Sequence, residues 1–161
     1  MAVMKARLSV LALLLTCLVS WTALAETDKR QSAPQDSESQ LTFHTLDDNT
    51  QQVNPDEIWR IRAAATSEEP RGAIVIDYAF ERVYVKDSLA NVVEKVNGVR
   101  PLRKFTLPSG APVYIVVSKV IGITRPIPHQ HHQNAHAVIV AREGQTHVQE
   151  TRETISEALV K

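Results

Sequence analysis

Histidines are concentrated in one short segment of the chain, and imidazole is a side chain well suited to metal chemistry. Four of the six histidines, His129, His131, His132 and His136, lie within residues 124–136, TRPIPHQHHQNAH. Imidazole nitrogens bind Zn²⁺, Cu²⁺ or Ni²⁺, and three or four of them make a site. His129 and His131 can present two rings on one side of an extended chain, whereas His132 and His136 can do so on a helical turn. The pattern therefore predicts an adaptive loop that binds one of these metals.

Two other interpretations of this histidine loop stay open. Residues 124–142 contain no cysteine and no acidic residue, so no carboxylate there is placed as a ligand or a base. The segment is then either a polar surface loop that is rich in histidine, or a patch that becomes charged as the pH falls through about 6.5. His147 lies one hairpin further along the chain, and we expect it to come near the loop.

Recognisable catalytic motifs do not occur in the sequence. It contains no Gly-x-Ser-x-Gly, Ser-x-x-Lys or His-Glu-x-x-His segment and no glycine-rich phosphate loop. Its one cysteine, Cys17, lies in a segment that we expect to be removed, so a cysteine nucleophile, a disulfide and a thiolate metal site are not expected. The sequence therefore favours a protein without catalytic activity.

Residues 1–25 have the pattern of a secretory signal peptide. Lys5 and Arg7 give a positive start, residues 8–19 are apolar, and an Ala-Leu-Ala segment ending at Ala25 precedes Glu26. The apolar run is too short to favour a retained membrane span. We therefore expect cleavage near Ala25 and Glu26, and a periplasmic or secreted protein.

The residues after the expected cleavage site divide into a polar stretch and a longer part rich in apolar side chains. Residues 26–40, ETDKRQSAPQDSESQ, cannot bury enough surface to fold and are expected to form a disordered tether. The cleaved chain keeps 16 basic and 18 acidic residues, a formal charge of −2. Because no basic face is evident, nucleic-acid binding is not expected. Residues 41–160 suffice for one compact domain.

The best-defined pattern in the chain predicts a strand, a turn, a strand and a short helix. Residues 74–76 are a β-branched run typical of a strand buried on both faces, and residues 82–86 alternate polar and apolar side chains. Asp87 or Ser88 would cap the helix, and Gly98 would end it in the left-handed conformation. The apolar stripe of that helix consists of Leu89, Val92, Val93 and Val96.

This pattern returns in degenerate form near the end of the chain. We therefore predict two tandem units, 41–98 and 103–160, each reading strand, turn, strand, short strand, loop, hairpin and helix. The expected fold class is α+β and β-rich, with both units packed as one compact domain around a shared core. A shift of 63 residues pairs Val75 with Val138, Val85 with Val148, Ser88 with Thr151 and Val92 with Ile155, and a shift of 62 pairs Phe43 with Phe105, Val53 with Ile115, Ile58 with Val120 and Ile61 with Ile123.

Two further segments bear on binding. Trp59 is the only tryptophan after the expected cleavage site. It either packs on the sheet or on the other unit, or it anchors a partner protein. Residues 112–117, PVYIVV, are strongly hydrophobic and should form a central strand; at an edge they would pair with an extended peptide.

The stretches LTFHTLDDNTQQVNPDEIWRI and VIDYAFERVYVKDSLANVVEKV carry a resemblance to a known family. On them, residues 41–97 resemble the small FlbD-like family of swarming-motility proteins and, more loosely, the LytTR DNA-binding domain. The resemblance implies a β-rich fold, but the export signal conflicts with a cytoplasmic flagellar or DNA-binding role. The residues that carry it are Asn54, Pro55, Asp56, Ile58, Ile61, Val85, Lys86, Ser88, Leu89 and Val92.

Two classes of function are consistent with these observations. Export, a tether, a repeated scaffold and absent catalytic motifs favour a non-catalytic periplasmic adaptor that binds another envelope protein through a strand edge or the Trp59 surface. The alternative is a periplasmic metal-binding protein that uses the histidine loop to supply, buffer or sense zinc, copper or nickel. The histidine loop separates the two, because only the second requires it.

Overall fold

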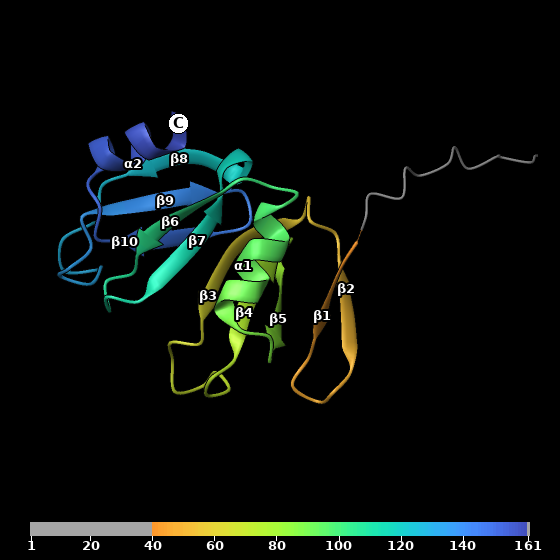
Figure 1. The fold of residues 1–161 in the computed structure, drawn as a ribbon. Coiled ribbons are helices and arrows are strands. Elements are labelled where there is room, and N and C mark those ends of the chain that lie inside the picture. Colours follow the sequence, from red (N-terminus) through yellow and green to blue (C-terminus); the bar gives the residue numbers. More distant parts are fainter. Residues whose placement is uncertain (1–39, 161) are drawn as a thin grey trace, which may run out of the picture. The chain divides into compact units, whose positions relative to one another are not determined.

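The computed structural model describes residues 40–160, which belong to one compact unit. The expected signal peptide and residues 26–39 of the expected tether lie outside the described residues. The described part contains ten strands in three antiparallel sheets and two short helices (Figure 1). The prediction of a β-rich α+β fold is therefore confirmed.

The first half of the domain, residues 41–98, consists of a hairpin, a three-stranded meander and a helix. β1 pairs only with β2 in a two-stranded sheet, and β3, β4 and β5 pair with one another in chain order. The elements are β1 (Leu41–His44), β2 (Thr50–Val53), β3 (Ile58–Ala63), β4 (Ile74–Tyr78), β5 (Glu81–Val85) and α1 (Leu89–Asn97).

The second half, residues 103–160, has the same order of elements. Its hairpin joins the first half because β7 pairs with β3, which gives a five-stranded sheet of order β5-β4-β3-β7-β6. The segment 112–117 thus supplies a central strand, as predicted. The elements are β6 (Leu102–Thr106), β7 (Pro112–Val116), a 3₁₀ turn (Val117–Lys119), β8 (Val120–Thr124), β9 (Ala137–Ala141), β10 (Gln145–Val148) and α2 (Arg152–Val160).

Helix α1 begins as predicted and ends differently. The Ser88 side chain accepts a hydrogen bond from the Asn91 backbone N–H at 3.3 Å, which satisfies one unpaired donor of the first turn. The expected left-handed conformation of Gly98 is wrong, since its φ is −63° and its N–H donates to the Glu94 carbonyl. The turn continues to Arg100 and stops before Pro101, which has no N–H to donate.

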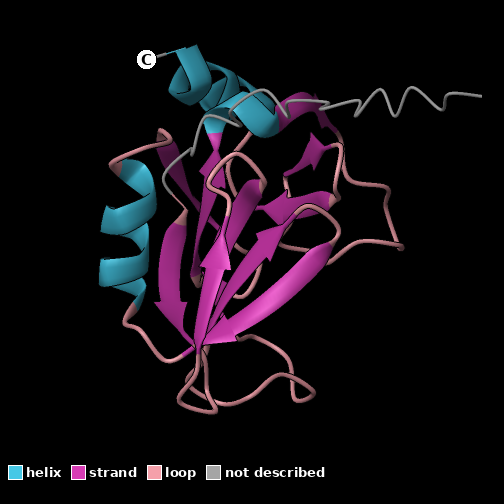
Figure 2. Ribbon diagram, turned by 90° about the vertical axis from the view of Figure 1, so that its right-hand side faces the viewer, coloured by secondary structure: helices cyan, strands magenta, loops and turns pink. Residues whose placement is uncertain are grey.

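The buried apolar side chains of residues 40–160 form two clusters, so the expectation of one shared core is wrong. The halves are joined through strand pairing of β3 with β7, and each half has its own helix: α1 packs on β3 and α2 on β8 (Figure 2). Strand β7 serves both clusters, because its successive side chains point to opposite faces of the sheet. The first cluster contains Phe43, Val53, Ile58, Ile61, Ile74, Ile76, Val85, Val92, Val96, Leu102 and Val116, and the second contains Phe105, Val113, Ile115, Ala137, Ile139, Val148 and Ile155.

Several local contacts recur between positions 62 or 63 residues apart. The turn after β1 holds Asp48 at a φ of 63°, and the turn after β6 holds Gly110 at 89°. A register shift of β3 against β4 between Ile58 and Arg60 has its counterpart in β8 against β9 between Val120 and Gly122. The recurring hydrogen bonds are Thr45 N–H to Asn49 O and Leu107 N–H to Ala111 O, and Lys86 N–H to His44 O and Gln149 N–H to Thr106 O.

Candidate interaction surface and histidine pair

The histidine loop connects β8 to β9 and lies largely at the surface. His129, His132 and His136 are exposed, and His131 is half-buried. His129 adopts a left-handed φ of 65° in a turn. The His132 Nδ1 atom accepts a hydrogen bond from the Asn134 backbone N–H at 3.1 Å, which occupies that nitrogen within the loop.

His131 contacts a histidine outside the loop. Its ring centroid lies 4.2 Å from that of His147 on β10, with the rings nearly perpendicular, so the expected approach of His147 is confirmed. The Ile127 backbone N–H donates to Nδ1 of His131 at 2.9 Å. A neutral His131 therefore carries its proton on Nε2.

The other half of this pair is unusually short of partners. The Nε2 atom of His147 is buried and has no hydrogen-bond partner among the described residues. Burial, with a smaller contribution from the charge of His131, lowers the pKa of His147. Both rings line a cavity of about 340 Å³ that Arg60 and Arg62 also border. A neutral imidazole with a free nitrogen is the form that binds metals.

The structure does not gather the four loop histidines into one site. Within residues 40–160, no group of three or more His, Cys, Asp or Glu side chains is placed to hold a metal ion. The pair that it does bring together is His131 with His147. The sequence analysis expected His147 nearby but did not include it among the ligands.

Trp59, the candidate partner anchor, is only 4% exposed. Its ring packs on the turn between β9 and β10, where a Cβ atom added to Gly144 would lie 3.1 Å from the ring. The Arg60 guanidinium lies 4.4 Å from the centroid of the same ring. Packing on the second half, one of the two roles left open by the sequence, accounts for this residue.

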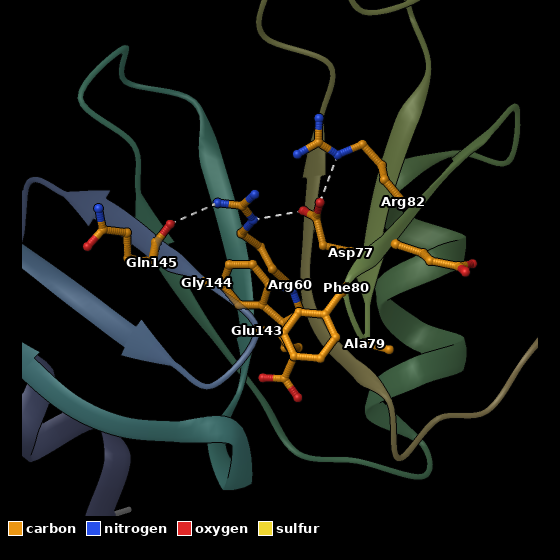
Figure 3. A pocket seen from close by; sticks show the side chains of 10 residues that line it. Arg60, Asp77, Ala79, Phe80, Arg82, Glu143, Gly144 and Gln145 are labelled. Carbon is orange, nitrogen blue, oxygen red and sulfur yellow. Dashed lines mark hydrogen bonds and ion pairs between the residues drawn. The ribbon is translucent and has the colours of Figure 1, made fainter.

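Beside Trp59, two arginines share one buried carboxylate. The Nε atoms of Arg60 and Arg82 each donate to Asp77 at 2.8 Å, one to each carboxylate oxygen (Figure 3). Arg60 also donates to the Thr146 hydroxyl at 2.9 Å and so reaches the second half. Burial lowers the pKa of Arg60, and Asp77 opposes that effect. These contacts join β3, β4, β5 and β10.

A second buried carboxylate continues this ion network, and the sequence analysis missed it. Glu69 is 6% exposed although it lies in a loop that we expected to be merely polar. It accepts two hydrogen bonds from Arg62, at 2.8 and 2.5 Å, one from Arg82 at 3.1 Å and one from the Ala65 backbone N–H at 2.8 Å. The hydrogen bonds from Arg62 hold the pKa of Glu69 at about 2.

A groove of about 290 Å³ lies between β3, the β4–β5 turn and the β9–β10 turn. Phe80 stands at its rim and is 78% exposed, next to Ala79, whose φ is 45°. Glu143 closes the other side, where one carboxylate oxygen is 3.2 Å from Lys119 and the other is buried with no partner among residues 40–160. The groove thus combines charged side chains with an exposed aromatic ring.

Two strand edges in the described part of the chain are unpaired and uncharged. β8 pairs only with β9 and β2 pairs only with β1, while the sequences VIGIT and TQQV contain neither charge nor proline. Ile121 on β8 is 69% exposed. Natural proteins usually protect such edges with lysine, proline or other charged residues. The outer strands of the five-stranded sheet follow that rule: β5 carries Glu81 and Arg82, and β6 carries Arg103 and Lys104.

Comparison with models of protein families, with curated proteins and with solved structures gives no significant match for this chain. The class of the protein therefore has to be argued from its own fold and surface. No helix within residues 40–160 is long and apolar enough to cross a membrane.

Proposed function

We propose that this protein is a non-catalytic interaction module of the cell envelope, exported by its signal peptide, which binds another envelope protein through an exposed strand edge. The observation that supports it best is the β8 edge, which is apolar, uncharged and unpaired within residues 40–160, with Ile121 69% exposed. Trp59, which the sequence put forward as the anchor, is buried. The proposed contact surface therefore moves to Ile121 and the exposed Phe80.

Strand addition explains how such an edge binds without a deep pocket. An unpaired edge offers a row of backbone N–H and C=O groups, and an extended segment of a partner satisfies them by continuing the sheet. The backbone hydrogen bonds supply affinity, and alternate side chains supply specificity. Ile121 is the large apolar side chain that this edge presents.

Site-specific photo-crosslinking in the protein's own cells tests this proposal. A photoreactive amino acid in place of Ile121 should give a discrete higher-mass adduct, which mass spectrometry can identify. The matched control carries the same amino acid at Glu94, an exposed position on α1 away from both free edges. Adducts that are absent at Ile121, or equally abundant at Glu94, would count against binding at this edge.

We also propose that the two halves derive from the duplication of one unit similar to the FlbD-like family. The equal order of elements and the recurring turns, bulges and hydrogen bonds support this origin. A unit of roughly 58 residues is at the margin of independent stability, which favours a fused pair. This origin concerns the scaffold and carries no flagellar or DNA-binding role with it.

A second candidate function is binding of Zn²⁺, Cu²⁺ or Ni²⁺, and a specific observation favours it. His131 and His147 lie in ring contact, and the Nε2 atom of His147 is buried with no partner among the described residues. Two imidazoles are an incomplete ligand set, so water or another loop histidine would have to complete the coordination.

Calorimetric titration of the three metals separates this candidate from the interaction module. We expect His131→Ala and His147→Ala to abolish the heat of binding, and His44→Ala, a matched histidine change on β1, to leave it intact. Heat that is retained in both pair variants would rule out this pair, and heat that is instead lost in His129→Ala, His132→Ala or His136→Ala would assign the site to the loop alone.

A further inference from the structure

One strand pair joins the two halves of the domain. β3 and β7 are antiparallel, and Arg60 lies opposite Ile115, Ile61 opposite Tyr114 and Arg62 opposite Val113. Both strands are thereby interior strands of the five-stranded sheet. Every other pairing within the three sheets joins strands of the same half.

The offset between the halves identifies the counterparts of these two strands. A shift of 62 residues forward takes β3 to β8, and the same shift backward takes β7 to β2. Those counterparts are the two uncharged, unpaired edges described above. The two free edges of the domain are therefore the strands equivalent to the ones that join its halves.

We propose that the envelope partner of this module is a second copy of the same chain, bound head to tail, with β8 of one copy paired antiparallel to β2 of the next. This inference rests on the proposed function, because it names the partner of the β8 edge. The register of the internal junction fixes the expected one: Gly122 lies opposite Val53 of the next copy, Ile123 opposite Gln52, and Thr124 opposite Gln51.

The exposed apolar side chains support the same arrangement independently of the strand edges. At the internal junction, Trp59 of the first half packs on Gly144 in the β9–β10 turn of the second half. The same offsets take Trp59 to Ile121 and Gly144 to Glu81, the neighbour of Phe80 in the β4–β5 turn. Head-to-tail packing therefore brings Ile121, 69% exposed, to the turn that carries Phe80, 78% exposed.

Such a contact is heterologous, since β8 on one copy meets a different strand, β2, on the next. Each added copy leaves one free β8 and one free β2, so assembly continues until a ring closes or a filament forms. Pairing of β8 with β2 inside one chain is not formed in the described residues. The β8 edge also lacks the arginines that mark β3, so the contact between copies depends on backbone hydrogen bonds and the Ile121–Phe80 contact.

Cysteine cross-linking between two purified variants tests the register directly, with the chain purified in the form that its cells contain. Thr124→Cys and Gln51→Cys, each exposed or half-buried, are mixed and oxidised, and the mixed disulfide dimer is quantified. We expect on the order of tenfold more of it than from Thr124→Cys mixed with Glu94→Cys, because pairing raises the local thiol concentration. The chain without introduced cysteines gives the background.

Two further variants make the outcome decisive. Adding Ile121→Lys to the Thr124→Cys chain should reduce the cross-link to the Glu94 background, because a lysine on an edge opposes pairing. Thr124→Cys alone cross-linking to itself would show β8 pairing with β8 and overturn the proposal, as would a matched pair no better than background. If the matched pair fails while photo-crosslinking at Ile121 captures a different envelope protein, the proposed function survives and the second copy is excluded.

Discussion

Strands β3 and β8 hold the same place in the two halves of the domain, yet one is an interior strand and the other an edge. Both have apolar residues at equivalent positions, Ile58 and Ile61 in β3 and Val120 and Ile123 in β8. β3 lies between β4 and β7, whereas β8 has only β9 beside it. The two strands therefore differ in the neighbour on one side, and the apolar pattern of a strand does not by itself decide its position in a sheet.

The comparison extends to the charges that each strand carries. β3 contributes Arg60 and Arg62, which are held by the buried carboxylates Asp77 and Glu69. At the equivalent places β8 has Gly122 and Thr124. Buried charges need such partners, since an unpaired buried charge is strongly destabilising. The interior strand thus has a fixed electrostatic environment, while the edge strand stays neutral and open to another chain.

The first prediction compares the two core clusters. Phe43→Ala and Phe105→Ala each remove a ring that is at most 2% exposed, and each should lower the free energy of unfolding by about 4 kcal/mol. Because β3 and β7 couple the halves, urea denaturation followed by circular dichroism should show one transition in both variants. Two separate transitions, with each variant shifting a different one, would mean that the halves unfold independently.

The second prediction compares Trp59 with its counterpart Ile121. Trp59→Ala should cost about 3.5 kcal/mol of stability, because the buried ring leaves a cavity against the β9–β10 turn. Ile121→Ala should change the stability of the single chain by less than about 0.5 kcal/mol, since surface changes have small effects. Thermal unfolding at low protein concentration measures both, and an equal loss in the two variants would contradict the assignment of β8 as a free edge.

The third prediction concerns the buried carboxylate Glu69. Glu69→Gln should cost about 3 kcal/mol near neutral pH, because it leaves the charges of Arg62 and Arg82 unbalanced. The pKa of Glu69 is lowered from 4.5 to about 2, so its stabilisation is complete above pH 4.5 and is lost as the pH falls toward 2. Unfolding measured from pH 6 down to about 2 should show a slope in that window that the Glu69→Gln variant lacks.

The smallest expected effect concerns the two helix caps. Asn91 N–H donates to the Ser88 hydroxyl and Thr154 N–H to the Thr151 hydroxyl, both at 3.3 Å. Ser88→Ala and Thr151→Ala should each cost about 1 kcal/mol. Chemical denaturation of the pair tests whether the ends of α1 and α2 are equivalent. A loss in one variant with none in the other would show that the equivalence does not reach the helices.

The sequence was informative where structure is local. The apolar spacing around Val92 and the cap at Ser88 predict α1, and residues 74–86 predict the β4–β5 hairpin, because these patterns involve near neighbours. The buried role of Glu69 could not be predicted, since its polar loop reveals nothing of Arg62 folding back against it. The pairing of β3 with β7 joins residues far apart in sequence, and the two separate cores result from that pairing.

The candidate site was predicted in part for the same reason. Clustering within the histidine loop is visible in the sequence, whereas the contact of His131 with His147 depends on how the loop folds onto β10. Trp59 stands out by its residue type, but its burial depends on Gly144 in the other half. The free edge at β8 became evident only once the strand order was known, because its apolar pattern matches that of the interior strand β3.

Sedimentation velocity of the purified chain across a range of concentrations, beside its Ile121→Lys variant, tests the central claim most directly. We predict that the sedimentation coefficient of the unaltered chain rises with concentration and that the Ile121→Lys chain stays monomeric with the same circular dichroism spectrum. A single monomeric species at every concentration for both chains would contradict pairing of the free edges between copies.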